Sequence, residues 1–280
     1  MYQNIKIKNK SGDIISIDLR YNELEGVKLP ILIFCHGFKG FKDWGGFPYM
    51  LNKISEQNIF TVSFNFSFNG TDNTKDNPND FDRLDLFAQN TFSRELDDTG
   101  EVIEFLIKNS EIYNYNINNI TIAGHSRGGG IAILKTAEDK RIKKLITLAS
   151  VSEFNRYTEE RKKQWKERGY LEVLNTRTKQ YMRMNYSLIE DLKINYSRLN
   201  ITEAVKKINV PVLILHGKED IAVDYSDAET IYNLSDKTKS KFLLIENTGH
   251  TFGISHPFNG TNKVFEKVLT EMVNWVNVIE

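Results

Sequence analysis

A serine stands at the centre of the pentapeptide Gly124-His-Ser-Arg-Gly128, and its surroundings suit a nucleophile. The strand-like run Ile120–Ala123 precedes it, and a helical pattern over Gly128–Ala137 follows it. A strained turn between a strand and a helix exposes a serine hydroxyl, and small neighbours let the two elements approach closely. A phosphate-binding loop is the alternative reading, but the glycine motifs of dinucleotide and P-loop sites are missing. The sequence therefore predicts Ser126 as a catalytic nucleophile.

A serine hydroxyl is a weak nucleophile until a neighbouring base takes its proton, and histidine is the usual base. Among the five histidines, His250 follows the last expected strand, which brings it to the same sheet edge as Ser126. His256, beside a proline, is the second candidate. His36 and His216 each follow a core strand and precede glycine, which favours a structural role. His125 is adjacent to the serine and is expected to point away from its hydroxyl.

The base needs a carboxylate that fixes its tautomer and stabilises its charged form. Asp220 lies just past the apolar run Val212–Leu215, so the chain order is serine, acid, histidine. Asp220 is therefore the predicted acid. Its neighbouring competitors, each also explained by a solvated surface position, are Glu219, Asp224 and Asp227.

The oxyanion formed during acyl transfer needs two backbone N–H groups aimed at it. The residue after the nucleophile, Arg127, supplies the first. The loop after the apolar run Ile31–Cys35 supplies the second, which we assign to Phe38, and Gly37 lets that loop approach the substrate.

The elements that must position these residues alternate between strand and helix patterns. Such alternation predicts a mostly parallel sheet with helices on both faces. The stretch Asn69–Asp82 is polar enough to be a loop. The expected strands are Ile5–Lys8, Ile14–Leu19, Ile31–Cys35, Ile59–Phe64, Ile120–Ala123, Lys144–Ala149, Val212–Leu215 and Lys241–Ile245, and the expected helices are Phe47–Glu56, Phe92–Asn109, Gly128–Ala137 and Lys263–Val278.

The segment 152–207 breaks this alternation between two expected core strands. Long excursions inside compact domains are usually functional, so we expect an inserted cap here, on a core of residues 1–151 and 208–280. An ordinary surface excursion is the alternative. Within it the patterns predict a charged helix over Glu159–Arg168 and two short strands. Aromatic and methionine side chains offer apolar contact area, which makes three residues candidate substrate contacts: Trp165, Tyr181 and Met182.

Four motifs taken together resemble the α/β-hydrolase superfamily: Phe34-Cys-His-Gly-Phe38, Gly124-His-Ser-Arg-Gly128, His216-Gly-Lys-Glu-Asp220 and Gly249-His250. They look most like its dienelactone-hydrolase-like and feruloyl-esterase-like bacterial branch. The resemblance covers about residues 14–278 and implies serine hydrolysis on an α/β-hydrolase fold, with a cap after the sixth strand. Dienelactone hydrolases use cysteine where this chain has Ser126, which favours an esterase. The His-Gly-Gly-Gly run of lipases is absent, which argues against a long-chain lipase.

Composition limits the partners. Lys+Arg and Asp+Glu both number 37, so no net charge attracts nucleic acid or an anionic membrane. The single cysteine, Cys35, lies in an apolar run and is expected to be a buried thiol. The N-terminus has no signal-peptide pattern, and no apolar run is long enough to span a membrane. We therefore expect a cytoplasmic protein without nucleic-acid or membrane partners.

The expected function is the hydrolysis of carboxylic esters of small acyl or aromatic acids through an acyl-enzyme, without a cofactor. Metal hydrolysis is disfavoured because no His-Glu-x-x-His motif or Cys/His cluster occurs. Two alternatives stay open. One is peptide or amide hydrolysis of the prolyl-oligopeptidase type, and the other is a catalytically silent hydrolase fold that serves as a binding protein.

Overall fold

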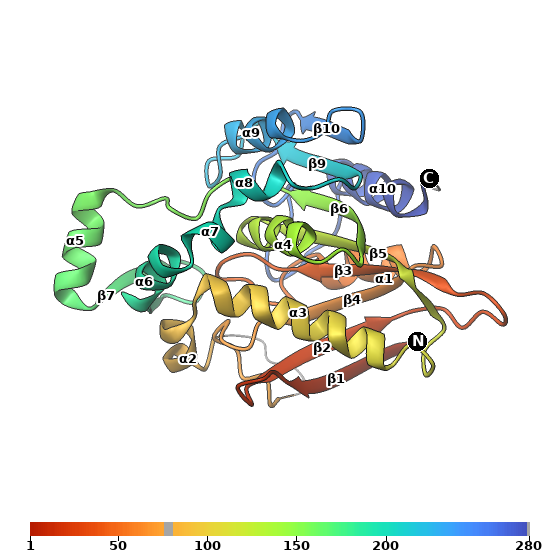
Figure 1. Cartoon of the computed structure of the whole chain (residues 1–280), viewed down its shortest axis with the longest axis horizontal. Helices are drawn as coiled ribbons and strands as arrows, with labels where there is room; N and C mark the ends of the chain where they lie inside the picture. The colour runs from red at the N-terminus through yellow and green to blue at the C-terminus, as the bar shows by residue number, and fades with distance from the viewer. Residues whose placement is uncertain (76–80, 279–280) are drawn as a thin grey trace.

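A central eight-stranded sheet organises the molecule, in the order β1-β2-β4-β3-β5-β6-β9-β10 (Figure 1). The structure, a computed structural model, describes residues 1–75 and 81–278. Pairing is parallel from β4 through to β10, whereas β1 and β2 are antiparallel to their neighbours. The strands are β1 (Tyr2–Lys8), β2 (Ile14–Arg20), β3 (Leu29–Cys35), β4 (Phe60–Asn65), β5 (Tyr115–His125), β6 (Ile142–Leu148), β9 (Val212–Gly217) and β10 (Ser240–Ile245).

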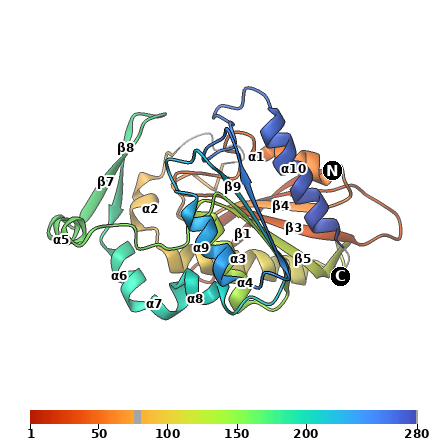
Figure 2. The same ribbon diagram turned by 90° about the horizontal axis from the view of Figure 1, so that it is seen from above.

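Helices cover both faces of this sheet (Figures 1 and 2). Helices α1 (Phe47–Ser55) and α10 (Lys263–Asn277) bury their apolar stripes against one face, around Phe34 and Leu213. Helices α3 (Phe92–Lys108), α4 (Arg127–Glu138) and α9 (Ser226–Leu234) lie on the other face. The central strands are buried on both faces, which explains their continuous apolar sequences.

The expected fold is confirmed: a mostly parallel sheet with helices on both faces. Every expected core strand is present, within a few residues of the expected bounds. Outside the insertion, two of the described helices had no expectation, α2 (Leu84–Gln89) and α9; α2 is only six residues long, too short for a clear helical period. Of the expected loop Asn69–Asp82, residues 76–80 lie outside the described part of the chain. None of the described helices is long and apolar enough to cross a membrane.

Residues between β6 and β9 form an insertion that projects from the body at α5 and at the β7–β8 hairpin (Figures 1 and 2). Thr158 caps the first helix by accepting a hydrogen bond from the Arg161 amide at 3.3 Å, and Gly169, at φ 83°, ends it. Later helices return the chain to the body. The elements are α5 (Glu159–Arg168), β7 (Tyr170–Asn175), β8 (Gln180–Asn185), α6 (Ser187–Ile194), α7 (Tyr196–Leu199) and α8 (Ile201–Val205).

Candidate active site

Ser126 occupies the turn between β5 and α4, with φ 57° and ψ −120°. This left-handed backbone is strained for a serine, and its surroundings enforce it. A Cβ on Gly124 would lie 2.1 Å from the carbonyl oxygen of Gly128, and one on Gly128 would lie 2.4 Å from that of Cys35. Only glycine lets the strand, the turn and the helix pack this closely. The expected strand–turn–helix geometry around Ser126 is therefore present.

His250 and Asp220 form a close pair at the same sheet edge. His250 Nδ1 donates to Asp220 Oδ2 at 2.7 Å, which leaves Nε2 as the ring nitrogen able to accept a proton. The other carboxylate oxygen accepts from the amides of Ala222 and Val223, at 2.8 and 2.9 Å. The ring of His216 lies 3.2 Å from Asp220 Oδ2. The carboxylate is thus held on both oxygens.

These contacts control the charge of Asp220. Burial raises its pKa, but the hydrogen bonds from His216 and His250 outweigh burial and hold the pKa well below the usual range of an aspartate. The carboxylate therefore stays charged beside His250. A charged carboxylate in this position can stabilise the positive charge that forms when a neighbouring base takes up a proton.

The competing acids have other partners. Asp224 is exposed, and its Oδ1 accepts from the Ser226 amide at 2.9 Å. Asp227 accepts from the amide and hydroxyl of Ser152, both at 2.6 Å, and forms an ion pair with Arg156. Neither carboxylate pairs with a histidine among the described residues.

His125 has a supporting role that sequence reasoning missed. Its Nε2–H donates to the carbonyl oxygen of His250 at 2.9 Å, and the two rings lie 4.7 Å apart. Burial, and then the neighbouring His250, lower the pKa of His125 to about 3, so this ring stays neutral. The residue before Ser126 thereby fixes the loop that carries His250. Its position beside the serine motif was the only sequence signal.

The other two histidines near the site also make backbone contacts. His36 Nδ1 lies 2.9 Å from the carbonyl oxygen of Gly37, and burial lowers its pKa to about 4. His256 Nδ1 accepts from the amide of Gly45 at 2.7 Å and its ring stacks on Trp44. His250, in contrast, pairs with the carboxylate of Asp220.

The loop after β3 lies directly against Ser126. A Cβ on Gly37 would come within 2.9 Å of Ser126 Cβ. Among the described residues, neither the Phe38 amide nor the Arg127 amide donates to the protein, and Arg127 is the first residue of α4, where helical amides lack partners. The two predicted oxyanion donors therefore belong to segments that adjoin Ser126, and no described group accepts a hydrogen bond from either amide.

The Arg127 side chain ties these two donor segments together. Its guanidinium lies 4.2 Å from the ring of Phe38 and 5.0 Å from that of Phe92. Its Nη1 also forms an ion pair with buried Glu95 at 3.3 Å. Burial raises the pKa of Glu95, an effect that Arg127 and Asn90 oppose. One side chain thus links the turn at Ser126 to the loop carrying Phe38.

Two hollows meet at Ser126 and His250. The first hollow, of about 310 Å³, is lined by Gly37, Phe38, Lys39, Gly40, Trp44, Phe47, His125, Ser126, Asn175, Arg177, His250, Thr251 and His256. The second hollow, of about 530 Å³, is lined by Phe38, Lys39, Phe92, Ser126, Arg127, Val151, Glu153, Phe154, Arg156, Tyr157, Val173, Ala222, Val223 and His250. Among the described residues, no hydrogen bond joins the Ser126 and His250 side chains, and catalytic hydrogen bonds often form only when substrate binds.

The structure places the three expected substrate contacts in the insertion away from the two hollows. Trp165 is buried, and its Nε1–H donates to the carbonyl oxygen of Met184 at 2.8 Å. Met182 is fully buried in the core, and Tyr181 is exposed. None of the three lines either hollow. The insertion instead contributes residues of its linker and hairpin: Glu153, Phe154, Arg156, Tyr157, Val173, Asn175 and Arg177.

The fold and the site together define an α/β hydrolase. A family model gives the narrower class: the BD-FAE model matches residues 84–234, more than half of the chain. The chain therefore belongs to the BD-FAE family. The matched segment contains Ser126 and Asp220 and ends before His250. No curated protein matched the chain.

Solved structures share the fold over nearly the whole chain. Est1E from Butyrivibrio proteoclasticus has a TM-score of 0.67 at 17% identity, with 98% of each chain covered. GrgF from Penicillium sp. sh18, an alpha/beta hydrolase, has 0.71 at 16% identity, with 99% of this chain and 98% of that chain covered. The esterase domain of a Rhodothermus marinus protein has 0.64 at 17% identity, covering 99% and 100%. At these identities the likeness concerns the fold.

Proposed function

We propose that the protein is a serine hydrolase that cleaves carboxylic esters of small acyl or aromatic acids through an acyl-enzyme. Ser126 is the nucleophile, His250 the base and Asp220 the acid. The observation that carries this proposal is the 2.7 Å pair between His250 and Asp220, at the two hollows that also contain the strained Ser126. Structures of Est1E, one of them with ferulic acid bound, support an ester of an aromatic acid as substrate.

The chemistry proceeds in two halves. The Ser126 hydroxyl turns toward His250 Nε2, loses its proton to that nitrogen and attacks the ester carbonyl carbon. The amides of Phe38 and Arg127 hold the resulting oxyanion. When the carbon–oxygen bond to the alcohol breaks, His250 returns the proton to the departing alcohol. Water then attacks the acyl-enzyme in the same way, releasing the acid and restoring Ser126.

The insertion at 152–207 acts in this proposal as a cap on a core of residues 1–151 and 208–280. Its linker and hairpin supply walls to both hollows, through Tyr157 and Val173 in the second and Asn175 in the first. A substrate in either hollow therefore contacts both core and insertion.

The test combines a covalent probe with the variant Ser126→Ala. A fluorophosphonate should label the wild type and leave the variant unlabelled, because only an activated serine attacks the probe. Turnover of 4-nitrophenyl and hydroxycinnamoyl esters should fall by about 10³-fold or more, since members of a triad act as a unit. Circular dichroism of both proteins checks that the fold is retained.

Two further assays separate this function from its competitors. Peptidyl anilides should be cleaved much more slowly than the esters, and EDTA should leave ester turnover unchanged. Labelling that persists in Ser126→Ala would reject the nucleophile. If anilides were cleaved faster than the esters, the protein would be an amidase. If the wild type were neither labelled nor active, the protein would instead be a catalytically silent binding protein.

A further inference from the structure

The first hollow contains the positively charged ammonium group of Lys39. Its lining contains Lys39 and Arg177 beside several aromatic rings, and no aspartate or glutamate occurs among its described lining residues. The second hollow, in contrast, includes Glu153. One side of Ser126 therefore carries the Lys39 ammonium group, with no carboxylate among the described residues that line it.

Protein carboxylates already neutralise two other cations at the site. Arg127 is paired with Glu95 at 3.3 Å, and Arg156 with Asp227 at 3.1 Å. Lys39 differs, because within residues 1–75 and 81–278 it forms no ion pair. Its Nζ donates only to the carbonyl oxygen of Leu174, at 3.3 Å.

Lys39 is also held in an unusual position. Its backbone has φ 54°, a left-handed conformation that glycine or asparagine adopts more easily than lysine. The side chain is half-buried between the loop after β3 and the hairpin, and it lines both hollows at Ser126. Partial burial lowers the pKa of its ammonium group. A lysine that is desolvated and lacks a carboxylate gains from any anion that enters.

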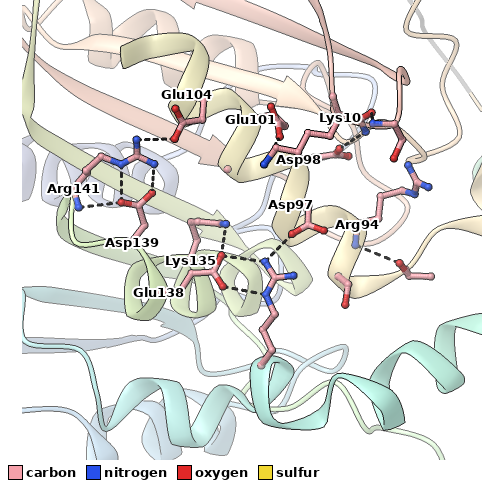
Figure 3. Close-up of a pocket in the computed structure, with 16 residues that line it drawn as sticks. Lys10, Arg94, Asp97, Asp98, Glu101, Glu104, Lys135, Glu138, Asp139 and Arg141 are labelled. Carbon is pink, nitrogen blue, oxygen red and sulfur yellow. Dashed lines mark hydrogen bonds and ion pairs between the residues drawn. The ribbon is translucent and has the colours of Figure 1, made fainter. Parts of the chain in front are cut away.

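A second charged region is a groove lined mainly by residues of α3 and α4. In this groove, carboxylates of the protein form ion pairs with the cations. There Arg141 pairs with Asp139 and Glu104, and Arg198 of α7 pairs with Glu138 and Asp97 (Figure 3). The cations of that groove are held by the protein's own acids. Lys39 is available to a ligand.

We propose that the first hollow is a subsite for the anionic part of the substrate, with Lys39 as the residue that selects a carboxylate-bearing ester. The proposal rests on the proposed ester hydrolysis and narrows its substrate class. The carboxylate takes an ion pair from the Lys39 ammonium, while Trp44 and Phe47 pack against the apolar portion. The neutral portion of the ester occupies the second hollow, whose walls are mostly apolar.

The experiment compares 4-nitrophenyl 4-carboxybenzoate with its neutral analogue of the same size, 4-nitrophenyl 4-carbamoylbenzoate. A second pair, 4-carboxyphenyl acetate and 4-carbamoylphenyl acetate, places the charge on the alcohol side. The quantity measured is the ratio of kcat/KM for the charged and the neutral ester. In at least one pair this ratio should fall by about fivefold or more in Lys39→Gln, because an ion pair is lost. Lys39→Arg should retain most of it.

Lys143→Gln is the matched control. The Lys143 ammonium also donates to a backbone carbonyl oxygen, that of Lys140, at 3.1 Å. Lys143 lies at the other end of the sheet from Ser126. Its ratio should equal that of the wild type. High salt should reduce the ratio of the wild type and not that of Lys39→Gln. An unchanged ratio in Lys39→Gln for both pairs, with ester hydrolysis intact, would reject the subsite alone. Absence of all ester hydrolysis and fluorophosphonate labelling would instead reject the underlying function.

Discussion

At the scale of single residues, Asp220 is the most constrained side chain of the site. Two backbone amides hold one of its oxygens, and the rings of His250 and His216 approach the other. This arrangement fixes the direction of the carboxylate before any substrate binds. It also places one oxygen beside His250 Nδ1, so the orientation of that ring depends on Asp220.

Asp220→Asn should therefore lower kcat by about 10³-fold or more, because the amide removes the charge behind His250 and allows the wrong tautomer. Asp224→Asn is the matched control on the same loop, since Asp224 is exposed and caps a neighbouring turn. It should change kcat by less than about twofold. Steady-state ester hydrolysis measures both variants, with circular dichroism as a check of folding. The reverse ranking would move the acid to Asp224.

Local sequence predicts much of this site, and long-range packing decides the rest. The turn at Ser126 is predictable because glycines two residues away on each side leave few other structures for a strand followed by a helix. Substrate contacts in the insertion are not predictable in this way. Tyr181 and Met182 are adjacent on β8, so they point to opposite faces of the hairpin and cannot share a pocket. Trp165 is the main apolar residue of an otherwise charged helix, and its side chain is buried by packing within the insertion.

At the scale of elements, the β7–β8 hairpin connects the insertion to the site. Val173 and Asn175 lie on one face of β7 and reach the second and first hollows, whereas Leu174 between them is exposed. The alternation of the strand thus divides the hairpin into a site face and a solvent face. The exposed Tyr181 pairs with Leu174 across the hairpin, on the solvent face.

This division gives a test of whether the insertion acts as a cap. Val173→Phe should fill part of the second hollow and lower kcat/KM for bulky aromatic esters at least about fivefold relative to acetate esters. Tyr181→Ala, on the solvent face of the same hairpin, should leave that selectivity unchanged. Rates with matched acetate and aromatic esters decide the matter, and fluorophosphonate labelling reports on Ser126. Equal selectivity in both variants would make the insertion a structural feature only.

At the scale of the whole molecule, two buried histidines make stability depend on pH. Burial lowers the folded-state pKa of His36 to about 4 and is the largest cause of the fall for His125, to about 3. In the unfolded chain both side chains have a pKa of about 6.5. Below that pH the unfolded chain binds protons that the folded protein does not, so stability falls as pH falls. Burial raises the pKa values of Glu95 and Asp98, which acts in the opposite direction.

A single variant isolates the histidine contribution. Between pH 7.5 and 5.0, His36→Gln should lose about 2 kcal/mol less unfolding free energy than the wild type, because it no longer takes up a proton on unfolding. Urea denaturation at the two pH values measures this difference. Glu95 and Asp98 are present in both proteins, so their effects cancel. Equal losses in the two proteins would show that His36 titrates normally in the folded state.

The stacking of Trp44 on His256 at the wall of the first hollow has an optical consequence. The chain has three tryptophans, and the others lie apart from the site, Trp165 within the insertion and Trp275 on α10. With Trp165 and Trp275 replaced by phenylalanine, and with excitation at a wavelength that tyrosine does not absorb, the emission comes from Trp44 alone. Occupancy of the first hollow then becomes visible as a change in intrinsic fluorescence. Ligands that are never hydrolysed can be titrated in this way, without a chromogenic leaving group.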